Sequence, residues 1–119
     1  GSLGAGAQKF KAYAEANGVD PSVYVGESYD AAALIVLAIA LGKSDDSASI
    51  AANIMKVANG PGTKIYAGEL AKGLELASAG FAVDYDGATD VNFTEVGEAF
   101  GAFIEKGIEG GAFVDVAQR

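Results

Sequence analysis

The sequence predicts a single mixed α and β (α/β) domain, with four helices followed by a C-terminal β-hairpin. Apolar residues recur at helical spacing up to about residue 79. From Phe81 onward, β-branched and aromatic residues separated by Asp, Asn and Gly favour strands instead. The chain has 119 residues, half of them apolar, which suits one domain by the usual prior of roughly 100 to 200 residues.

The first two helices are expected on either side of a short strand. Residues 5–17 place Phe10 and Ala14 on one face, as in an amphipathic helix. Residues 22–25 are mostly β-branched or aromatic and follow a turn signal, so we expect a strand there. Residues 28–41 are apolar nearly all round, which predicts a helix that is covered on most sides.

The third and fourth helices are predicted over residues 44–58 and 67–79, because apolar residues recur there at i, i+4 and i+7. Ser44, Asp45 and Asp46 supply the cap and the first-turn acids of the third helix. A glycine, the residue that most readily ends a helix in the left-handed conformation, follows each of the four predicted helices. These glycines are Gly18, Gly42, Gly60 and Gly80.

Three strands are predicted in the last third of the chain, over residues 91–93, 99–106 and 112–116. The last two are joined by the glycine-rich residues 107–111 and are expected to form an antiparallel hairpin. The earlier segment 59–64 contains glycines and a lysine but lacks the order of a phosphate-binding loop, so we interpret it as an ordinary loop.

Composition excludes several classes of function. The formal net charge of -8 disfavours binding to nucleic acid and to anionic lipid. The chain has no histidine and no cysteine, which removes Ser-His-Asp and Cys-His nucleophile systems, thiolate zinc sites and disulfides. We therefore expect no enzymatic activity, no cofactor and no metal site.

Two features of the chain bear on its origin and setting. Gly1 and Ser2 resemble the remnant of a removed tag, which leaves residues 3–119 as the protein itself. The longest apolar run, residues 31–41, is too short to span a bilayer and has the length of a core helix.

An acidic stretch after residue 83 partly imitates a calcium-binding loop. Asp84, Asp86 and Glu95 have the character of calcium ligands. However, Ala88 stands where a ligand is needed and Thr89 where the sharp turn needs glycine. We interpret the stretch as a solvated turn, and an acidic interaction domain stabilised by calcium stays open as an alternative.

The segment from Tyr24 to Tyr29 is the most informative local feature, because a predicted strand ends, Gly26 permits a tight turn and a helix begins. Turns of this kind at the carboxyl edge of an α/β sheet bind ligands. The alternative is that Tyr24 and Tyr29 only pack beside the helix, while Glu27 or Ser28 satisfies its free backbone amides. The residues alone leave both interpretations open.

Three pieces of the chain resemble one protein family. The helix that opens with Tyr29-Asp30-Ala31, the stretch Gly68-Glu69-Leu70-Ala71-Lys72-Gly73-Leu74-Glu75-Leu76, and a closing strand with Gly111, Phe113 and Val116 occur in the same order and spacing. Together they are similar to the C-terminal region of type I periplasmic solute-binding proteins of ABC importers, in the branched-chain amino acid and amide (Leu/Ile/Val-binding-like) family. The sequence departs from the family at Asp90, where glycine is usual, and at Thr94, where aspartate is usual.

The resemblance implies a type I periplasmic-binding fold, in which two α/β lobes close on a small ligand. It places Tyr24 in the cleft, packed on an aliphatic part of the ligand, with Glu27 beside it and facing a ligand ammonium. It implies a C-terminal fragment of a periplasmic protein, or of one tethered outside a Gram-positive cell, that delivers amino acids or amides to a membrane permease. A ligand-sensing regulator on the same fold is the alternative within this class.

A C-terminal portion of a two-lobed protein has incomplete sheets. Apolar helix faces and open strand edges are then exposed, and such surfaces usually find a partner. We therefore expect this chain by itself to self-associate, for example by exchanging elements between copies, and to bind ligand poorly.

Overall fold

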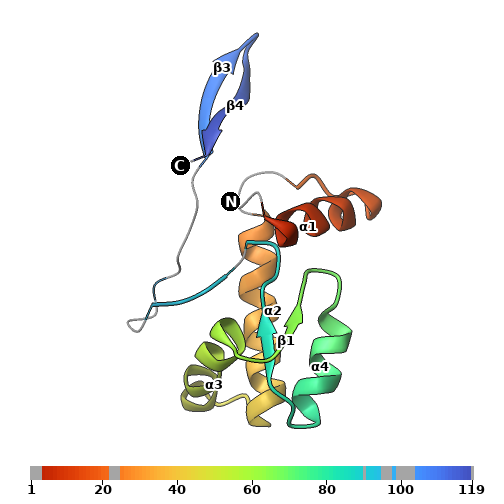
Figure 1. The fold of residues 1–119 in the computed structure, drawn as a ribbon, viewed down its shortest axis with the longest axis vertical. Coiled ribbons are helices and arrows are strands. Elements are labelled where there is room, and N and C mark those ends of the chain that lie inside the picture. Colours follow the sequence, from red (N-terminus) through yellow and green to blue (C-terminus); the bar gives the residue numbers. More distant parts are fainter. Residues whose placement is uncertain (1–3, 22–24, 90, 95–97, 99–103, 119) are drawn as a thin grey trace.

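The computed structural model describes residues 4–21, 25–89, 91–94, 98 and 104–118. The described residues contain helices and strands in a mixed order, which confirms the predicted mixed α and β class (Figure 1). Along the chain these are α1 (Ala5–Ala16), α2 (Val25–Gly42), α3 (Ser47–Asn59), β1 (Thr63–Ile65), α4 (Leu70–Ser78), β2 (Val83–Tyr85), β3 (Ile104–Glu109) and β4 (Ala112–Gln118).

A small parallel sheet lies at the centre of the helical body. β1 and β2 pair in parallel, with Ile65 opposite Tyr85, and α4 is the crossover helix between them. Ile65, Val83 and Tyr85 are buried on one face of this sheet. Lys64 and Asp84, which alternate with them, lie on the other face, where the Lys64 ammonium is 3.9 Å from Asp84 and 3.6 Å from Asp86. The sheet thus has one apolar and one charged face.

The main core is formed where α2, α3 and α4 pack around the apolar face of this sheet. Its buried members are Ala33, Leu34, Leu37, Val57, Ala58, Ile65, Val83, Tyr85 and Val91. α1 lies across the N-terminal end of α2 (Figure 1) and contributes Phe10 and Ala14 to a second, smaller cluster with Ala67 and Ala88. The two clusters meet at Tyr29, which packs against both.

The structure differs from two of the predicted strands where it describes their residues. Val25, expected at the end of a strand, is the first residue of α2, and residues 22–24 lie outside the described part of the chain. In residues 91–93 only Phe93 makes an isolated bridge. The segment is held instead by the Asn59 side chain, which donates to the Phe93 carbonyl at 2.9 Å and accepts from its N–H at 2.7 Å. A side-chain amide thus supplies the pairing that a neighbouring strand would give.

β1 and β2 are not among the strands predicted from the sequence. Thr63 and Lys64 belong to the segment that was predicted to be a loop, and Asp84 to the stretch interpreted as a solvated turn. Each strand has only three residues. Alternation over three residues is too short to separate a strand from a loop by pattern, and their pairing depends on the intervening helix.

The predicted antiparallel hairpin is present but shifted. β3 and β4 pair from Ile104 opposite Gln118 to Glu109 opposite Ala112. The connecting turn contains Gly110 and Gly111, both with positive φ, so residues 107–109 are part of the strand and not of the loop. Residues 99–103 of the predicted strand lie outside the described part. Figure 1 shows the hairpin well apart from the helical body.

α2 is less covered than predicted. Its residues alternate in pairs between a buried face, with Ala33 and Leu34, and an exposed face. The exposed face consists of Ala31, Ala32, Ile35 and Val36, and the two larger side chains are 43% and 39% exposed. α2 is also long and apolar enough to cross a membrane, but the core helices of soluble proteins pass the same test.

The exposed face of α2 leads to a test of self-association. We expect this chain to form dimers or larger species, because water-exposed apolar faces are buried on association. Ile35→Lys should shift the population toward monomer, measured by light scattering after size-exclusion chromatography. Phe81→Lys is the matched control, since Phe81 is also exposed, at 62%, but lies outside this face. A wild-type chain that is monomeric at all concentrations would contradict the expectation.

Candidate functional site

A buried carboxylate joins α2 to the turn that follows β2. Asp30 is only 2% exposed and lies in the second turn of α2. One of its oxygens accepts from the Tyr85 hydroxyl at 2.8 Å and from the Ala88 N–H at 2.9 Å. The other accepts from the Thr89 N–H at 2.8 Å and from the Thr89 hydroxyl at 2.5 Å. These hydrogen bonds offset the free-energy cost of removing the Asp30 carboxylate from water.

Two glycines allow the close approach that these bonds need. A Cβ atom on Gly26 would lie 3.3 Å from the Cβ of Ala88, so the first turn of α2 already touches the turn after β2. Gly87 has a φ of +61°, and a Cβ atom there would collide with the Asp30 carboxylate and the Tyr85 ring. The path of residues 86–89 is therefore set by contact with Asp30.

Two turns that follow parallel strands meet the N-terminal end of α2. The turn after β1 is held there by Tyr29, whose hydroxyl accepts from the Gly68 N–H at 3.2 Å. The turn after β2 is held by Asp30, as described above. The carboxyl edge of the sheet and the start of α2 thus lie at the same end of the body (Figure 1). In α/β proteins, this edge is where ligands bind.

A small aromatic pocket opens at this end, between α1 and α2. Its volume is about 250 Å³. The Phe10 ring lies 5.6 Å from the Tyr29 ring in a tilted arrangement, and the Tyr13 ring lies 6.2 Å from it in an edge-to-face arrangement. Its lining residues carry no formal charge: Phe10, Tyr13, Ala14, Asn17, Val19, Val25 and Tyr29. Such a lining suits an aliphatic or aromatic group.

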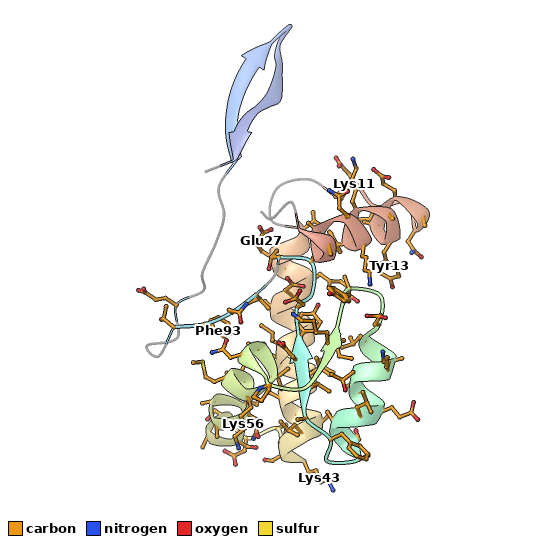
Figure 2. The ribbon with its side chains drawn as sticks, in the orientation of Figure 1. Lys11, Tyr13, Glu27, Lys43, Lys56 and Phe93 are labelled. Carbon is orange, nitrogen blue, oxygen red and sulfur yellow. The ribbon has the colours of Figure 1, made fainter. Side chains whose placement is uncertain are left out.

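The two residues predicted to bind ligand fall differently in the structure. Tyr24 lies outside the described residues. Glu27 is exposed in the first turn of α2, at the end of the body where the sheet's carboxyl edge lies (Figure 2). Glu27 and Ser28, expected to satisfy the free backbone amides at the start of this helix, both lie inside α2, in its first turn.

The acidic stretch that begins in β2 forms ion pairs with Lys64 of β1. Asp86 and Asp84 both lie near the Lys64 ammonium, and their charges raise the pKa of Lys64 above its ordinary 10.5. Within the described residues no group of three or more acidic side chains is arranged to hold a metal ion. Glu95, the third acid of the calcium alternative, lies outside them.

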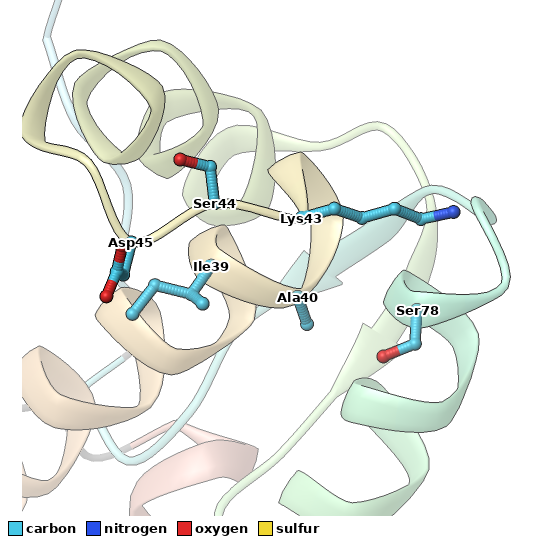
Figure 3. Close-up of a pocket in the computed structure, with 6 residues that line it drawn as sticks. All are labelled: Ile39, Ala40, Lys43, Ser44, Asp45 and Ser78. Atoms are coloured by element: carbon cyan, nitrogen blue, oxygen red, sulfur yellow. The ribbon is translucent and has the colours of Figure 1, made fainter.

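A second pocket lies at the opposite end of α2 and is larger, at about 520 Å³ (Figure 3). It is lined by Ile39, Ala40, Lys43, Ser44, Asp45 and Ser78. Lys43 directly follows α2 and has a φ of +54°, so it takes the left-handed position that was predicted for Gly42. Gly42 remains helical, and the lack of a side chain there allows α3 to approach, because a Cβ atom would collide with Ser49 and Asn53.

Sequence reasoning missed Asp30, Tyr85 and Thr89 as a connected group. One signal was available, since Asp30 is the single charged residue between Glu27 and Lys43 in an otherwise apolar helix. A lone charge at such a position indicates a satisfied buried carboxylate or a functional site. The partners could not be found from sequence, because they lie 55 to 59 residues away.

Comparisons with protein-family models, with curated proteins and with solved structures gave no significant match.

The buried phenol of Tyr85 predicts a stability change at high pH. Burial, together with the charge and hydrogen bond of Asp30, raises the pKa of Tyr85 far above its ordinary 10.0. Above pH 10 the unfolded chain loses this proton and the folded chain keeps it, so the free energy of unfolding should fall with rising pH. The contribution is up to about 1.4 kcal/mol per pH unit.

Tyr85→Phe should remove this contribution, which urea unfolding at pH values between 9 and about 11 would measure. Tyr13→Phe is the control for loss of a phenol at an exposed position. Equal slopes for the wild type and Tyr85→Phe would show that the phenol is not held by this contact.

Gly87→Ala tests the contact between the turn and Asp30. We expect a loss of more than about 2 kcal/mol in unfolding free energy, from left-handed backbone strain and the collision with Asp30. Gly80→Ala is the matched control, because Gly80 has a φ of +85° but nothing within 4 Å of an added Cβ. Its loss should be near 1 kcal/mol by the same backbone term. Equal losses in chemical denaturation would contradict the assigned contact.

Proposed function

We propose that this chain is the C-terminal part of the ligand-binding component of an ABC importer, which captures branched-chain amino acids or related amides. It resembles type I periplasmic solute-binding proteins in the helix that opens with Tyr29-Asp30-Ala31 and in the stretch that begins at Gly68. In this proposal the ligand lies in a cleft between two lobes. This chain supplies one edge of that cleft, and a membrane permease receives the solute.

The observation that supports this proposal best is the convergence at the N-terminal end of α2. Tyr29 and Asp30 fasten the turns after β1 and β2 to that end. The carboxyl edge of a parallel sheet and a helix start therefore form one rim, which is the usual place for small ligands in α/β proteins. The adjoining aromatic pocket adds an uncharged surface for an aliphatic group.

Glu27 and Tyr24 have distinct roles in this proposal. Glu27 is exposed on the rim, where its carboxylate attracts the ammonium group of an amino acid. Tyr24 precedes α2 by one residue and contributes an aromatic ring to the aliphatic part of the ligand. Burying a side chain the size of leucine or valine contributes about 1.5 to 3 kcal/mol. The ligand's carboxylate would be bound by residues outside this sequence.

The proposed location is the periplasm, or the outer face of a Gram-positive cell with a membrane tether. Two alternatives are kept, one within the same class of ligand-binding proteins and one from another class. A ligand-sensing regulator would use the same rim but transmit lobe closure to a signalling domain. An acidic interaction domain would use the charged stretch around Asp84 and Asp86, with calcium as a stabilising ion.

A thermal-shift screen of the full-length protein tests the proposal. We expect leucine, isoleucine, valine or their amides to raise the melting temperature, because a ligand at 100 times its Kd adds about 2.7 kcal/mol to the free energy of unfolding. Glu27→Gln should weaken binding about tenfold, which corresponds to about 1.4 kcal/mol. Binding is measured by isothermal titration calorimetry.

Glu15→Gln is the control for Glu27→Gln, since Glu15 is an exposed acid of α1 that does not line the pocket. Stabilisation by none of these solutes would overturn the proposal. Stabilisation by calcium alone would favour the acidic interaction domain.

A further inference from the structure

The first turn of α2 has little apolar packing of its own. Gly26 has no side chain, and Glu27 and Ser28 are exposed. Val25 is partly buried against the smaller of the two core clusters, and Tyr29, at the start of the next turn, is partly buried against both. The position of this turn therefore depends on other contacts.

The hydrogen bonds of Asp30 supply a strong contact at this place. They connect the second turn of α2 to the Tyr85 hydroxyl and to Ala88 and Thr89 of the turn after β2. Bonds to an ionised carboxylate are roughly twice as strong as bonds between neutral groups. Among the described residues, Asp30 is the one charged residue whose side chain is buried. It lies one helical turn beyond Glu27.

We propose that Asp30 is a positioning residue, which holds the first turn of α2 and residues 86–89 in one arrangement and thereby preorganises Glu27 for the ligand. The part that concerns the ligand rests on the function proposed above. A site that is competent only part of the time binds with an affinity reduced by the competent fraction. Loosening the Asp30 contacts should therefore weaken binding even though Asp30 does not touch the ligand.

Thr89 offers the mildest way to weaken these contacts. Thr89→Val keeps the shape of the side chain but removes the hydroxyl that donates to Asp30. Thr89→Ser keeps this hydroxyl and should rescue the wild-type behaviour. Asp30→Asn is the stronger variant, because an amide nitrogen would face the N–H groups that now donate to the carboxylate. If it does not fold, Thr89→Val still gives the answer.

Hydrogen exchange measures positioning without any ligand. The amides of residues 29–33 report opening of the first turn of α2, since each helical N–H bonds to the carbonyl four residues earlier. We expect at least threefold faster exchange there in Thr89→Val and Asp30→Asn, and no change in Thr89→Ser. Val57→Ala is the control for a general loss of core packing, because it weakens the buried core in α3 without removing a hydrogen bond of Asp30. Exchange equal to the wild type in both weakened variants would overturn the proposal.

Calorimetric titration of the full-length protein with L-leucine measures the consequence for binding. We expect the Kd to rise about tenfold in Asp30→Asn and at least threefold in Thr89→Val, and to change less than twofold in Thr89→Ser and Val57→Ala. Faster exchange with an unchanged Kd would overturn the role in binding. If the wild type binds neither L-leucine nor any other solute of the screen, the proposed function fails, and the exchange rates alone decide whether Asp30 positions α2.

Discussion

Asp30 carries a negative charge into an interior whose other described side chains are apolar, and the arrangement of the body follows from the need for hydrogen-bond partners of this carboxylate. Water cannot reach this carboxylate, so its bonds must come from protein donors. The structure provides Tyr85 at the end of β2 and the backbone of Ala88 and Thr89 just beyond. The carboxylate of Asp30 needs these donors close by. That need accounts for the path of the turn, for glycine at position 87 and for the start of α2 beside that turn.

The helices were largely predictable from the sequence, whereas the sheet and the site were not. Spacing of i, i+4 and i+7 around Ile54 and Leu74 located α3 and α4, because a helix leaves a periodic signal over several turns. β1 and β2 have three residues each, and their pairing depends on α4 bringing Ile65 beside Tyr85. α2 begins earlier than expected, at Val25, because contacts with a distant turn outweigh the local preference of a β-branched residue.

In the candidate site, too, single residues could be recognised from the sequence, whereas contacts between residues far apart in the chain could not. The resemblance assigned Glu27 to the ligand, and in the structure this residue is exposed in the first turn of α2. The lone charge of Asp30 was visible, but its role depends on donors more than 50 residues away. Exposed apolar helix faces were expected, but their place on α2 was not, because a helix that is apolar all round does not reveal which side its neighbours cover.

The contact between Tyr85 and Asp30 also affects the near-ultraviolet spectrum of the protein. The chain has five tyrosines and no tryptophan, so its near-ultraviolet absorption and emission come mainly from phenol rings. Tyr85 is fully buried and donates its hydroxyl proton to a carboxylate, whereas Tyr13 is 43% exposed to water. The phenols therefore sit in different surroundings, and the spectrum of the unmodified protein carries information about the end of the body where α2 begins.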